Sequence, residues 1–276
     1  MSMSLSPDIQ IKAPPLIKWP GGKRHLLRDI FPLLPRTFNR YFEPFVGSGA
    51  LFFALQPSKA TLSDTNKDLI NLYVQVRDNP NEIVDRVKKY KNSKKFYYSI
   101  RSQSPQTPLN KAARLLYLLN LSFNGIHRVN LRGEFNVPYG FKVHLPTHDE
   151  ERIRATSRAL AGVTLRTADF LRATALAAEG DLAYFDPPYT VAHADNGFLK
   201  YNEKIFSWND QIRLAAHAGK LADRGCHVFV SNADHPSVKK LYRGFRVATI
   251  KRFSIIAASS EYRRQITETV FYLRAY

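Results

Sequence analysis

The stretch DLAYFDPPY, residues 181–189, decides the fold. Its apolar first half is typical of a strand buried in a parallel sheet. A carboxylate, two prolines and an aromatic ring then follow without a break, as Asp186, Pro187, Pro188 and Tyr189. Because ligands bind at the carboxyl ends of strands in open α/β sheets, this stretch suits an exocyclic amine held beside a flat ring. A rigid turn in which Tyr189 only packs is the alternative.

A strand, a glycine turn and a helix are expected earlier in the chain. Residues 41–45 predict a strand, Gly47 and Gly49 predict a tight turn, and the apolar run 51–55 predicts a helix. Such a turn lets a cofactor approach the N-terminus of a helix closely. Phe52 replaces the third glycine of a dinucleotide fingerprint, which disfavours a nicotinamide cofactor and suits a smaller adenosyl cofactor. A tight turn without a ligand is the other interpretation.

Acidic residues follow two further predicted strands. Asp64 ends residues 60–64, where it can accept hydrogen bonds from both hydroxyls of a ribose or cap the helix that begins near Asn66. Asp169 and Phe170 follow residues 163–166 and can frame an adenine, or Asp169 can cap the next helix. The turn KWPGGK, residues 18–23, also allows close backbone approach to a ligand.

The order of these patterns predicts an α/β fold with an insertion. Strand-like runs lie at 41–45, 60–64, 163–166, 181–185, 228–231, 246–251 and 267–273. A helical block at 68–121 and a hairpin-like segment at 123–140 interrupt them. We therefore expect a catalytic domain formed by residues 1–68 and 159–276, and a smaller inserted domain at 69–158 that carries a β-hairpin.

The charge of the chain indicates a polyanionic partner. Lys and Arg number 41 against 23 acids, a net charge of +18, and residues 86–140 hold eleven of these cations with one acid, Glu134. A β-ribbon fits the major groove of DNA, where Arg reads guanine and Asn reads adenine. The hairpin residues expected at DNA are Asn124, Ile126, Arg128, Asn130, Arg132 and Pro138, and a basic loop adds Arg263 and Arg264 for phosphates. An ordinary exposed hairpin is the alternative.

The remaining composition excludes several classes of site. The single cysteine, Cys226, excludes a disulfide within the chain and a cysteine-built zinc site, and we expect it to be buried packing. No carboxylate cluster for a metal is evident, so we expect no metal. No apolar run of about 18–20 residues and no apolar signal core are found, so an intracellular protein without a membrane segment is expected.

Taken together, these stretches resemble the Dam-type DNA adenine-N6 methyltransferases, the alpha-ordered D12 class. The resemblance rests on the order of KWPGGK (18–23), EPFVGSGA (43–50), NG (124–125), LRGEFNVP (131–138) and DPPY (186–189), and spans residues 18–273. It implies a Rossmann-like methyltransferase sheet that binds S-adenosyl-L-methionine, and a helical target-recognition domain. Two positions depart from the best-known enteric pattern, His127 and Val129, and Ile126 stands where leucine is common.

The resemblance also assigns roles to individual residues. Cofactor contacts are expected from Trp19, Lys23, Glu43, Pro44, Phe45, Gly47, Gly49, Asp64, Asp169, Phe170 and Asp186. Arg128 and Pro138 match positions associated with reading GATC. The target N6 amine is expected to donate to Asp186 and to the Pro187 carbonyl while Tyr189 stacks on a flipped adenine.

The expected partner is double-stranded DNA, bound by a monomer, and whether a cognate restriction endonuclease accompanies it stays open. Methylation of RNA adenine and a non-catalytic DNA-binding relative are the alternatives. A protein-glutamine methyltransferase is disfavoured by Asp186, where that class usually has Asn, and by the net charge of +18. A nuclease is the least favoured class.

Overall fold

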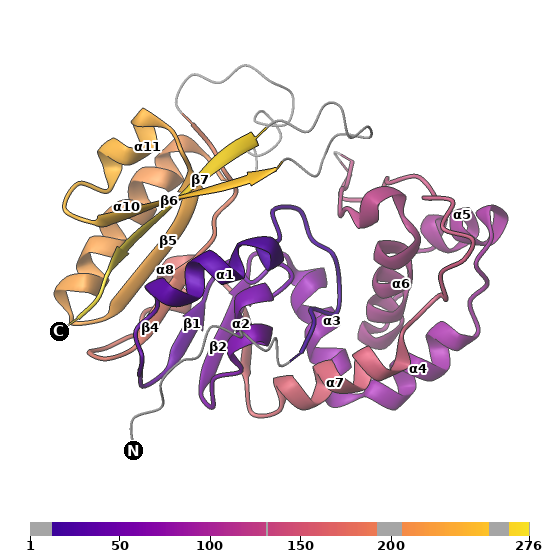
Figure 1. The fold of residues 1–276 in the computed structure, drawn as a ribbon. Helices are drawn as coiled ribbons and strands as arrows, with labels where there is room; N and C mark the ends of the chain where they lie inside the picture. The colour runs from indigo at the N-terminus through magenta and orange to yellow at the C-terminus, as the bar shows by residue number, and fades with distance from the viewer. Residues whose placement is uncertain (1–12, 131, 192–205, 254–264, 276) are drawn as a thin grey trace. The chain divides into compact units, whose positions relative to one another are not determined.

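The computed structural model describes residues 13–130, 132–191, 206–253 and 265–275 (Figure 1). Contacts within the chain divide it into two compact units. Unit 1 comprises Met1–Gly22, Val46–Gln56 and Asp64–Thr167. Unit 2 comprises Lys23–Phe45, Pro57–Ser63 and Ala168–Tyr276.

The described residues form a seven-stranded mixed sheet with the order β3-β2-β1-β4-β5-β7-β6. Strand β1 pairs in parallel with β2 and β4, β4 pairs in parallel with β5, and β7 runs antiparallel to both β5 and β6. This arrangement confirms the predicted Rossmann-like α/β fold, and every predicted strand is present. The strands are β1 (Tyr41–Glu43), β2 (Ala60–Asp64), β3 (Thr164–Thr167), β4 (Leu182–Phe185), β5 (His227–Ala233), β6 (Arg246–Phe253) and β7 (Gln265–Leu273).

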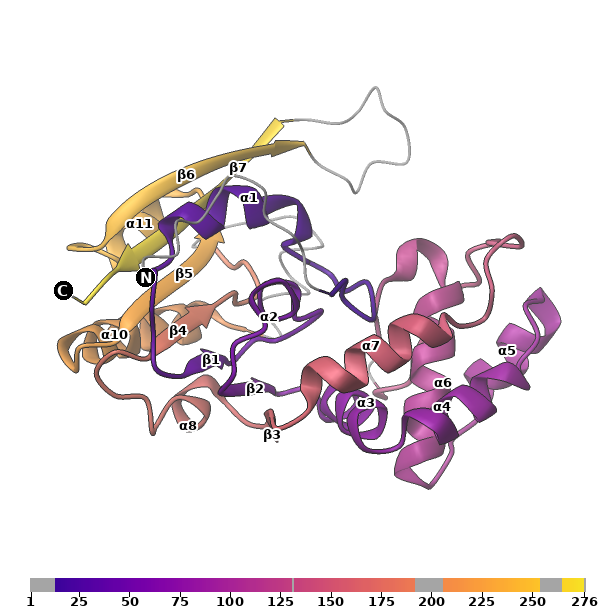
Figure 2. The same ribbon diagram turned by 60° about the horizontal axis from the view of Figure 1, so that its bottom comes forward.

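Unit 2 buries one face of the sheet under helices α8 (Phe170–Ala173), α10 (Trp208–Asp223) and α11 (Pro236–Leu241) (Figures 1 and 2). Successive side chains of a strand point to opposite faces, so this face takes every second residue. Its strand members are Phe42, Ala183, Phe185, Val228, Val230 and Phe271. The opposite face of the same strands therefore carries the intervening residues.

Local signals in the sequence define where the helices of unit 2 begin. Ser207 accepts a hydrogen bond from the backbone N–H of Asp210, and the Asp210 carboxylate accepts one in return, so α10 begins with a capping box. The short helices η1 (Arg24–Leu26), α1 (Leu27–Ile30) and η2 (Phe31–Leu33) connect Lys23 to β1.

Unit 1 contains the helical block that the apolar spacing predicts. Its helices are α2 (Ala50–Leu55), α3 (Lys67–Asp78), α4 (Pro80–Lys88), α5 (Lys94–Ser102), α6 (Pro108–Leu121), η3 (Phe123–Gly125) and α7 (Glu150–Leu160). Side chains of Asn66, Ser93, Thr107 and Asp149 cap α3, α5, α6 and α7. The contact-based units draw their boundaries elsewhere than at 69 and 158, and the division into a catalytic and a target-recognition domain stays a prediction.

Residues 122–140, which we call the arch, contain the predicted hairpin. The arch holds two isolated antiparallel bridges, Ser122↔Tyr139 and Val129↔Phe135, in place of two continuous strands. The backbone at Asn124 has a φ of 52° and that at Gly125 a φ of 65°. These left-handed residues turn the chain at the start of the arch, which interrupts regular strand pairing there.

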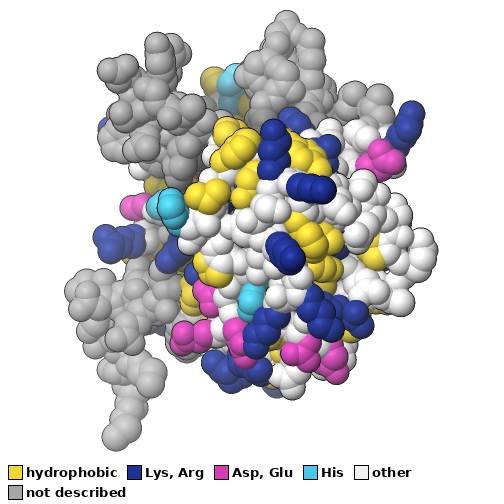
Figure 3. Space-filling view, turned by 90° about the vertical axis from the view of Figure 1, so that its right-hand side faces the viewer, with side chains coloured by type: hydrophobic (Ala, Val, Ile, Leu, Met, Phe, Trp, Pro, Cys, Tyr) yellow, Lys and Arg dark blue, Asp and Glu magenta, His cyan; other side chains and the backbone are white. Residues whose placement is uncertain are grey.

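The face shown in Figure 3 carries Lys and Arg side chains beside exposed hydrophobic side chains, with most of the visible Asp and Glu side chains in its lower half. The exposed hydrophobic residues of unit 1 include Phe123, Phe141, Val143 and Leu145. Among the described residues, no helix combines the length and apolar character needed to cross a membrane.

Candidate active site

Four side chains form a connected network at the carboxyl end of β4 in unit 2. The Lys23 ammonium lies 2.8 Å from Oδ1 of Asp186 and 3.5 Å from Oε2 of Glu268. The Tyr189 hydroxyl donates a 2.7 Å hydrogen bond to Oε2 of Glu268. The same ammonium lies 4.6 Å from the centroid of the Tyr189 ring. Lys23 therefore contacts the carboxylates of Asp186 and Glu268 and also the aromatic ring of Tyr189.

Tyr189 stays a neutral phenol in this network. Burial raises its pKa well above the ordinary value, and the negative charges of Asp186 and Glu268 raise it further. A neutral phenol can donate its proton to a carboxylate, which matches the observed bond to Glu268. The aromatic ring is consequently held by its hydroxyl, and the orientation of the ring depends on Glu268.

A third carboxylate, Glu43, lies at the end of β1 in the same unit. Its side chain is 3% exposed and accepts a 2.8 Å hydrogen bond from the Tyr41 hydroxyl. The pKa of Tyr41 is raised well above its ordinary value by burial first, then by the charge of Glu43, with smaller contributions from Tyr184 and Asp186. The charges of both Glu43 and Asp186 therefore raise the pKa of Tyr41.

The register of the sheet explains why these acids share one face. Tyr41 is opposite Leu182 in the β1–β4 pair, so Glu43 and Asp186 project to the same side. On the other flank, Phe229 is opposite Tyr272 and Ala233 is opposite Glu268. Counting by twos from each pair places the three acids on the face opposite the α8–α10–α11 core.

Sequence reasoning missed Glu268. The signal that could have found it is a single acid within the apolar strand β7, at an even spacing from Val270 and Tyr272. Such a residue, buried to 3% exposure, needs a polar partner, and here Lys23 and Tyr189 provide it.

Two buried amides hold the DPPY stretch to the sheet, and these were also missed. Nε2 of Gln211 donates to the Pro188 carbonyl at 3.2 Å, and Nδ2 of Asn232 donates to Oε1 of Gln211 at 2.8 Å. Oδ1 of Asn232 accepts from the backbone N–H of Ala233 at 2.9 Å. Gln211 and Asn232 are fully buried, so this relay ties Pro188 to α10 and β5 without solvent.

The glycine turn of unit 1 requires glycine at two positions. Gly47 and Gly49 have φ values of 46° and 65°, in the left-handed region. A Cβ on Gly47 would lie 2.8 Å from Cδ1 of Trp19, which is closer than side-chain atoms approach. The backbone of the turn therefore lies directly against the indole of Trp19.

Asp64 binds the same turn through its carboxylate. Oδ2 accepts from the Gly47 N–H at 3.3 Å, and Oδ1 accepts from the Asn66 N–H at 2.9 Å. Burial raises the pKa of Asp64 to about 6, and the backbone donors oppose part of that rise. The helix-capping alternative for Asp64 is wrong, because the side chain of Asn66 accepts from the first N–H groups of α3.

Asp169 and Phe170 occupy a different setting in unit 2. Oδ1 of Asp169 accepts from the Leu171 N–H at 2.9 Å and caps α8, which was the alternative interpretation of this acid. Phe170 is 2% exposed, and its ring contacts Phe45 at a centroid distance of 5.7 Å. The guanidinium of Arg213 lies 5.2 Å from the Phe170 centroid. Pro44 is buried beside Phe45 in the chain.

The arch residues that are predicted to contact DNA make different hydrogen bonds within the arch. Nε of Arg128 donates to Oδ1 of Asn136 at 2.8 Å, which holds an exposed guanidinium in one direction. Asn130 instead closes a turn, because its Oδ1 accepts from the N–H groups of Arg132 and Glu134 at 2.9 and 3.0 Å.

Other predicted DNA residues lie in the arch or beyond the described chain. Asn124 is exposed at the left-handed turn, Ile126 is half-buried, and the Pro138 carbonyl accepts from the Phe123 N–H at 2.9 Å. Arg263 and Arg264 lie outside the described residues.

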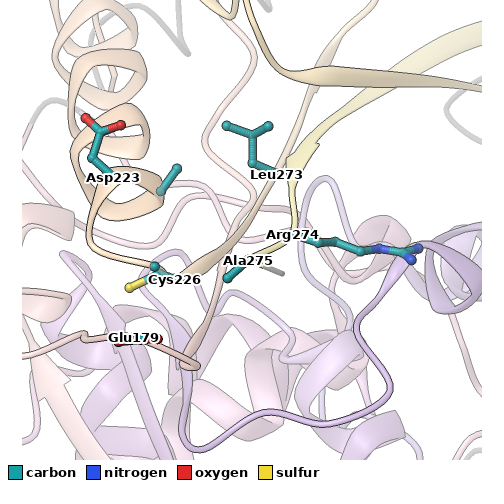
Figure 4. A pocket seen from close by; sticks show the side chains of 8 residues that line it. Glu179, Asp223, Cys226, Leu273, Arg274 and Ala275 are labelled. Atoms are coloured by element: carbon teal, nitrogen blue, oxygen red, sulfur yellow. The ribbon is translucent and has the colours of Figure 1, made fainter.

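A surface pocket of about 370 Å³ lies at the other end of the sheet in unit 2 (Figure 4). It is bounded by residues before the amino end of β5 and after the carboxyl end of the antiparallel β7, whereas Asp186 follows the carboxyl end of β4. The lining residues are Glu179, Ala222, Asp223, Gly225, Cys226, Leu273, Arg274 and Ala275. Cys226 is buried, as predicted, and burial raises the pKa of its thiol to about 11, which disfavours the reactive thiolate. In the part of the chain that the structure describes, no group of His, Cys, Asp and Glu could hold a metal ion.

Comparison with known proteins identifies the family. A family model described as D12 class N6 adenine-specific DNA methyltransferase matches residues 19–256. The type II methyltransferase M1.LlaDCHI of Lactococcus lactis subsp. cremoris is 38% identical, over 97% of this chain and 98% of that protein. The DNA adenine methylase of Escherichia coli K12 is 31% identical, over 91% of this chain and 92% of that protein. The DNA adenine methylase of Haemophilus influenzae is 32% identical, over 97% of this chain and 95% of that protein. The chain therefore belongs to the D12 class of adenine-specific DNA methyltransferases and methylates N6 of adenine in DNA.

Proposed function

We propose that the chain transfers a methyl group from S-adenosyl-L-methionine to N6 of an adenine flipped out of duplex DNA, within GATC or another GAT-containing site. The network of Lys23, Asp186, Tyr189 and Glu268 is the observation that carries this proposal. It combines a hydrogen-bond acceptor for an amine with an oriented aromatic ring for a base.

The amine chemistry follows from the acceptors of the DPPY stretch. The N6 lone pair of adenine is delocalised into the ring, so the amine is a poor nucleophile. Hydrogen bonds from N6 to the Asp186 carboxylate and the Pro187 carbonyl localise that pair and direct it. Lys23 holds the Asp186 carboxylate at 2.8 Å, so the acceptor is positioned before the base arrives. Catalysis is then mostly positioning and electrostatics, and the N6 proton displaced by the new N–C bond is released to solvent.

The charge of the site suits the proposed methyl donor. S-adenosyl-L-methionine supplies a methyl group on a positively charged sulfonium, which leaves as a neutral thioether. Glu43, Asp186, Glu268 and Lys23 together carry a formal charge of −2, in a protein whose net charge is +18. Glu43 and Glu268 are buried and Asp186 is partly buried, and acids in such a setting favour a cation over an anion. This charge supports a sulfonium ligand in unit 2.

Unit 1 supplies groups that fit the adenosyl part of the donor. The Asp64 carboxylate keeps lone pairs for two ribose hydroxyls beyond those that bind Gly47 and Asn66. Gly47 and Gly49 place no side chain at their positions in the turn, and Trp19 adds an apolar wall. We extend the proposal to Glu43, Pro44, Phe45, Asp169 and Phe170 on the family resemblance.

DNA recognition is assigned to the arch and to the other basic residues of segment 86–140. Arg128 is held by Asn136 with its guanidinium exposed, which suits a contact with guanine in the major groove. The target adenine must leave the base stack, because no atom of a paired base can reach the DPPY stretch inside a duplex. We propose that one monomer acts on one DNA site inside the cell.

The proposal is tested by incubating the protein with duplex DNA and methyl-labelled S-adenosyl-L-methionine, and then mapping modified bases by sequencing. Label on N6 of adenine within GATC is the expected result. Label on adenine at an unrelated motif overturns the assignment of Arg128 and retains the DPPY chemistry. Label on RNA but not on duplex DNA, from the same incubation with both, overturns the choice of substrate.

A further inference from the structure

Trp19 contacts two parts of unit 1 that the proposed function keeps separate. The imidazole of His127 stacks on its indole, with centroids 4.8 Å apart and planes inclined by 19°. The backbone of Gly47 lies so close to the indole that a Cβ there would be 2.8 Å from Cδ1. His127 belongs to the arch, and Gly47 belongs to the glycine turn.

The contact continues from Gly47 to the proposed ribose acceptor. The Gly47 N–H donates to Oδ2 of Asp64 at 3.3 Å, and the Gly47 carbonyl accepts from the Tyr73 hydroxyl at 2.7 Å. Only Trp19 and Gly47 therefore separate His127 from Asp64 along this path. Gly47 cannot yield space by moving a side chain, because it has none.

On its other side, His127 is fixed to the part of the arch that carries Arg128. Its ring lies 5.8 Å from the Phe135 ring in an edge-on arrangement. Val129 pairs with Phe135, and Arg128 donates to Asn136, so both neighbours of His127 are held across the arch. A displacement of Arg128 against DNA must therefore move or restrain the imidazole.

His127 stacks as a neutral ring. Burial lowers its pKa, and the charge of Asp68 opposes that change. An aromatic pair of this geometry is stabilising beyond the burial of its area, so the stack biases the position of Trp19. A second contact links the same segments, since a Cβ on Gly125 would lie 3.2 Å from Cβ of Lys18.

We infer that His127 is a positioning residue that couples DNA engagement by the arch to binding of the methyl donor at Trp19, Gly47 and Asp64. DNA that fixes Arg128 holds the imidazole on Trp19, and Trp19 in turn holds the glycine turn in its binding geometry. The two ligands then bind with positive cooperativity, and by thermodynamic linkage each strengthens the other by the same factor. This inference rests on the proposed function, because it takes the donor site and the DNA contact from there.

The experiment measures the dissociation constant of S-adenosylhomocysteine by calorimetry, with and without saturating duplex of the mapped target sequence. This product analogue prevents turnover during the measurement. We expect the duplex to tighten binding by about fivefold or more in the wild-type protein, the lower end of usual allosteric coupling. His127→Ala should reduce that ratio to below about twofold while changing the affinity without DNA by less than about threefold. His127→Phe, the matched control, retains a ring and should keep the wild-type ratio.

A second measurement follows Trp19 directly. The chain has two tryptophans, so Trp208→Phe leaves Trp19 as the single indole emitter. Addition of duplex should change its emission in this background, and His127→Ala should abolish that change. A wild-type coupling ratio of one, or a ratio unchanged by His127→Ala in a folded protein, overturns the inference. Failure to bind S-adenosylhomocysteine at all overturns the proposed function instead, which separates the two results.

Discussion

Tyr189 and Glu268, 79 residues apart in the sequence, are joined by a 2.7 Å hydrogen bond from the phenol to the carboxylate. Lys23 lies within 3.5 Å of the same carboxylate oxygen and 4.6 Å from the centre of the Tyr189 ring. The ring that we propose to stack on the target adenine is thus oriented by a strand outside the DPPY stretch. Glu268 acts on the reaction through Tyr189 and Lys23, so we regard it as a positioning residue.

The first prediction concerns this pair. Tyr189→Phe and Glu268→Gln each remove the charged hydrogen bond, and each should lower kcat by about tenfold, the size of effect expected for 1–2 kcal/mol of lost orientation. Because both changes remove one interaction, the double variant should be less impaired than the product of the two, with a coupling energy of about 0.5–3 kcal/mol. Tyr272→Phe, on the same strand as Glu268, is the matched control and should leave kcat unchanged.

Tyr189→Ala should act differently, because it removes the ring itself. Stacking of a base on an aromatic side chain is worth about 1–3 kcal/mol, so capture of the flipped base should weaken. Fluorescence of 2-aminopurine at the target position reports that capture. Additive losses in the double variant, or full capture by Tyr189→Ala, would show that the pair does not orient the base.

The buried relay through Gln211 gives the second prediction. Gln211→Met keeps the volume of the side chain but removes the donor to the Pro188 carbonyl and the acceptor for Asn232. We expect the melting temperature to fall, since an unpaired buried polar group costs about 1–3 kcal/mol. We also expect kcat to fall by up to about 100-fold, because small displacements of reacting groups are costly. Gln75→Met, on α3, is a control on a half-buried glutamine that takes no part in this relay. An unchanged kcat in a destabilised Gln211→Met protein would restrict the relay to a role in stability.

The third prediction is a pH dependence of cofactor affinity. The pKa of Asp64 is raised to about 6 by burial, so this acid begins to protonate as the pH falls through 6. A protonated carboxyl loses acceptor capacity for the ribose hydroxyls, and affinity for S-adenosylhomocysteine should then fall by up to about tenfold per pH unit below 6. Asp64→Asn should bind weakly at all pH values and lose the dependence. Calorimetry between pH 5 and 8 tests this, and a flat profile for the wild-type protein would remove Asp64 from the site.

The raised pKa of Asp64 also affects the stability of the folded protein. Because the folded-state pKa of Asp64 lies above its ordinary value, ionisation of this acid lowers the stability of the unliganded protein as the pH rises from 3.8 to about 6, and the loss is complete above that range. Asp64→Asn should therefore raise the melting temperature of the unliganded protein at pH 8 and have less effect at pH 4. This opposition between stability and binding is expected of a functional carboxylate.

Sequence reasoning predicted the strands and the glycine turn because their signals are local. A run such as 181–185 followed by Asp186 and two prolines requires no knowledge of distant segments. The capping box at the start of α10 is likewise a local signal, because it involves only Ser207 and Asp210. The arch was less regular than the expected hairpin, because Asn124 and Gly125 adopt left-handed backbone that the pattern of polar residues does not reveal.

Long-range partners were not predictable in the same way. Glu268, Gln211 and Asn232 are linked to the DPPY stretch only in the folded chain, where β7 pairs with β5, β5 pairs with β4, and α10 packs on β5. Their contacts depend on strand register, which the sequence of one strand does not encode. The stack of His127 on Trp19 likewise joins residues more than a hundred positions apart.

The fourth prediction concerns Arg128. Arg128→Ala should weaken discrimination at one guanine of the target by about 1–3 kcal/mol, so that sites with another base there are methylated. Arg154→Ala, which removes a half-buried arginine paired with Glu150 from α7, should leave the site preference unchanged. Sequencing of methylated random duplexes measures both. Identical preferences for wild-type and Arg128→Ala proteins would assign base reading to other residues.

The role of Asp186 is tested by the rate of a single methyl transfer in Asp186→Ala, measured with donor and target duplex both bound at saturation. Because Asp186 is the proposed acceptor that prepares N6, we predict no detectable transfer. DNA affinity should stay within about threefold of wild type, because phosphate contacts dominate that affinity. A melting curve close to that of the wild type establishes that the variant is folded. Transfer at the wild-type rate by folded Asp186→Ala would contradict the mechanism.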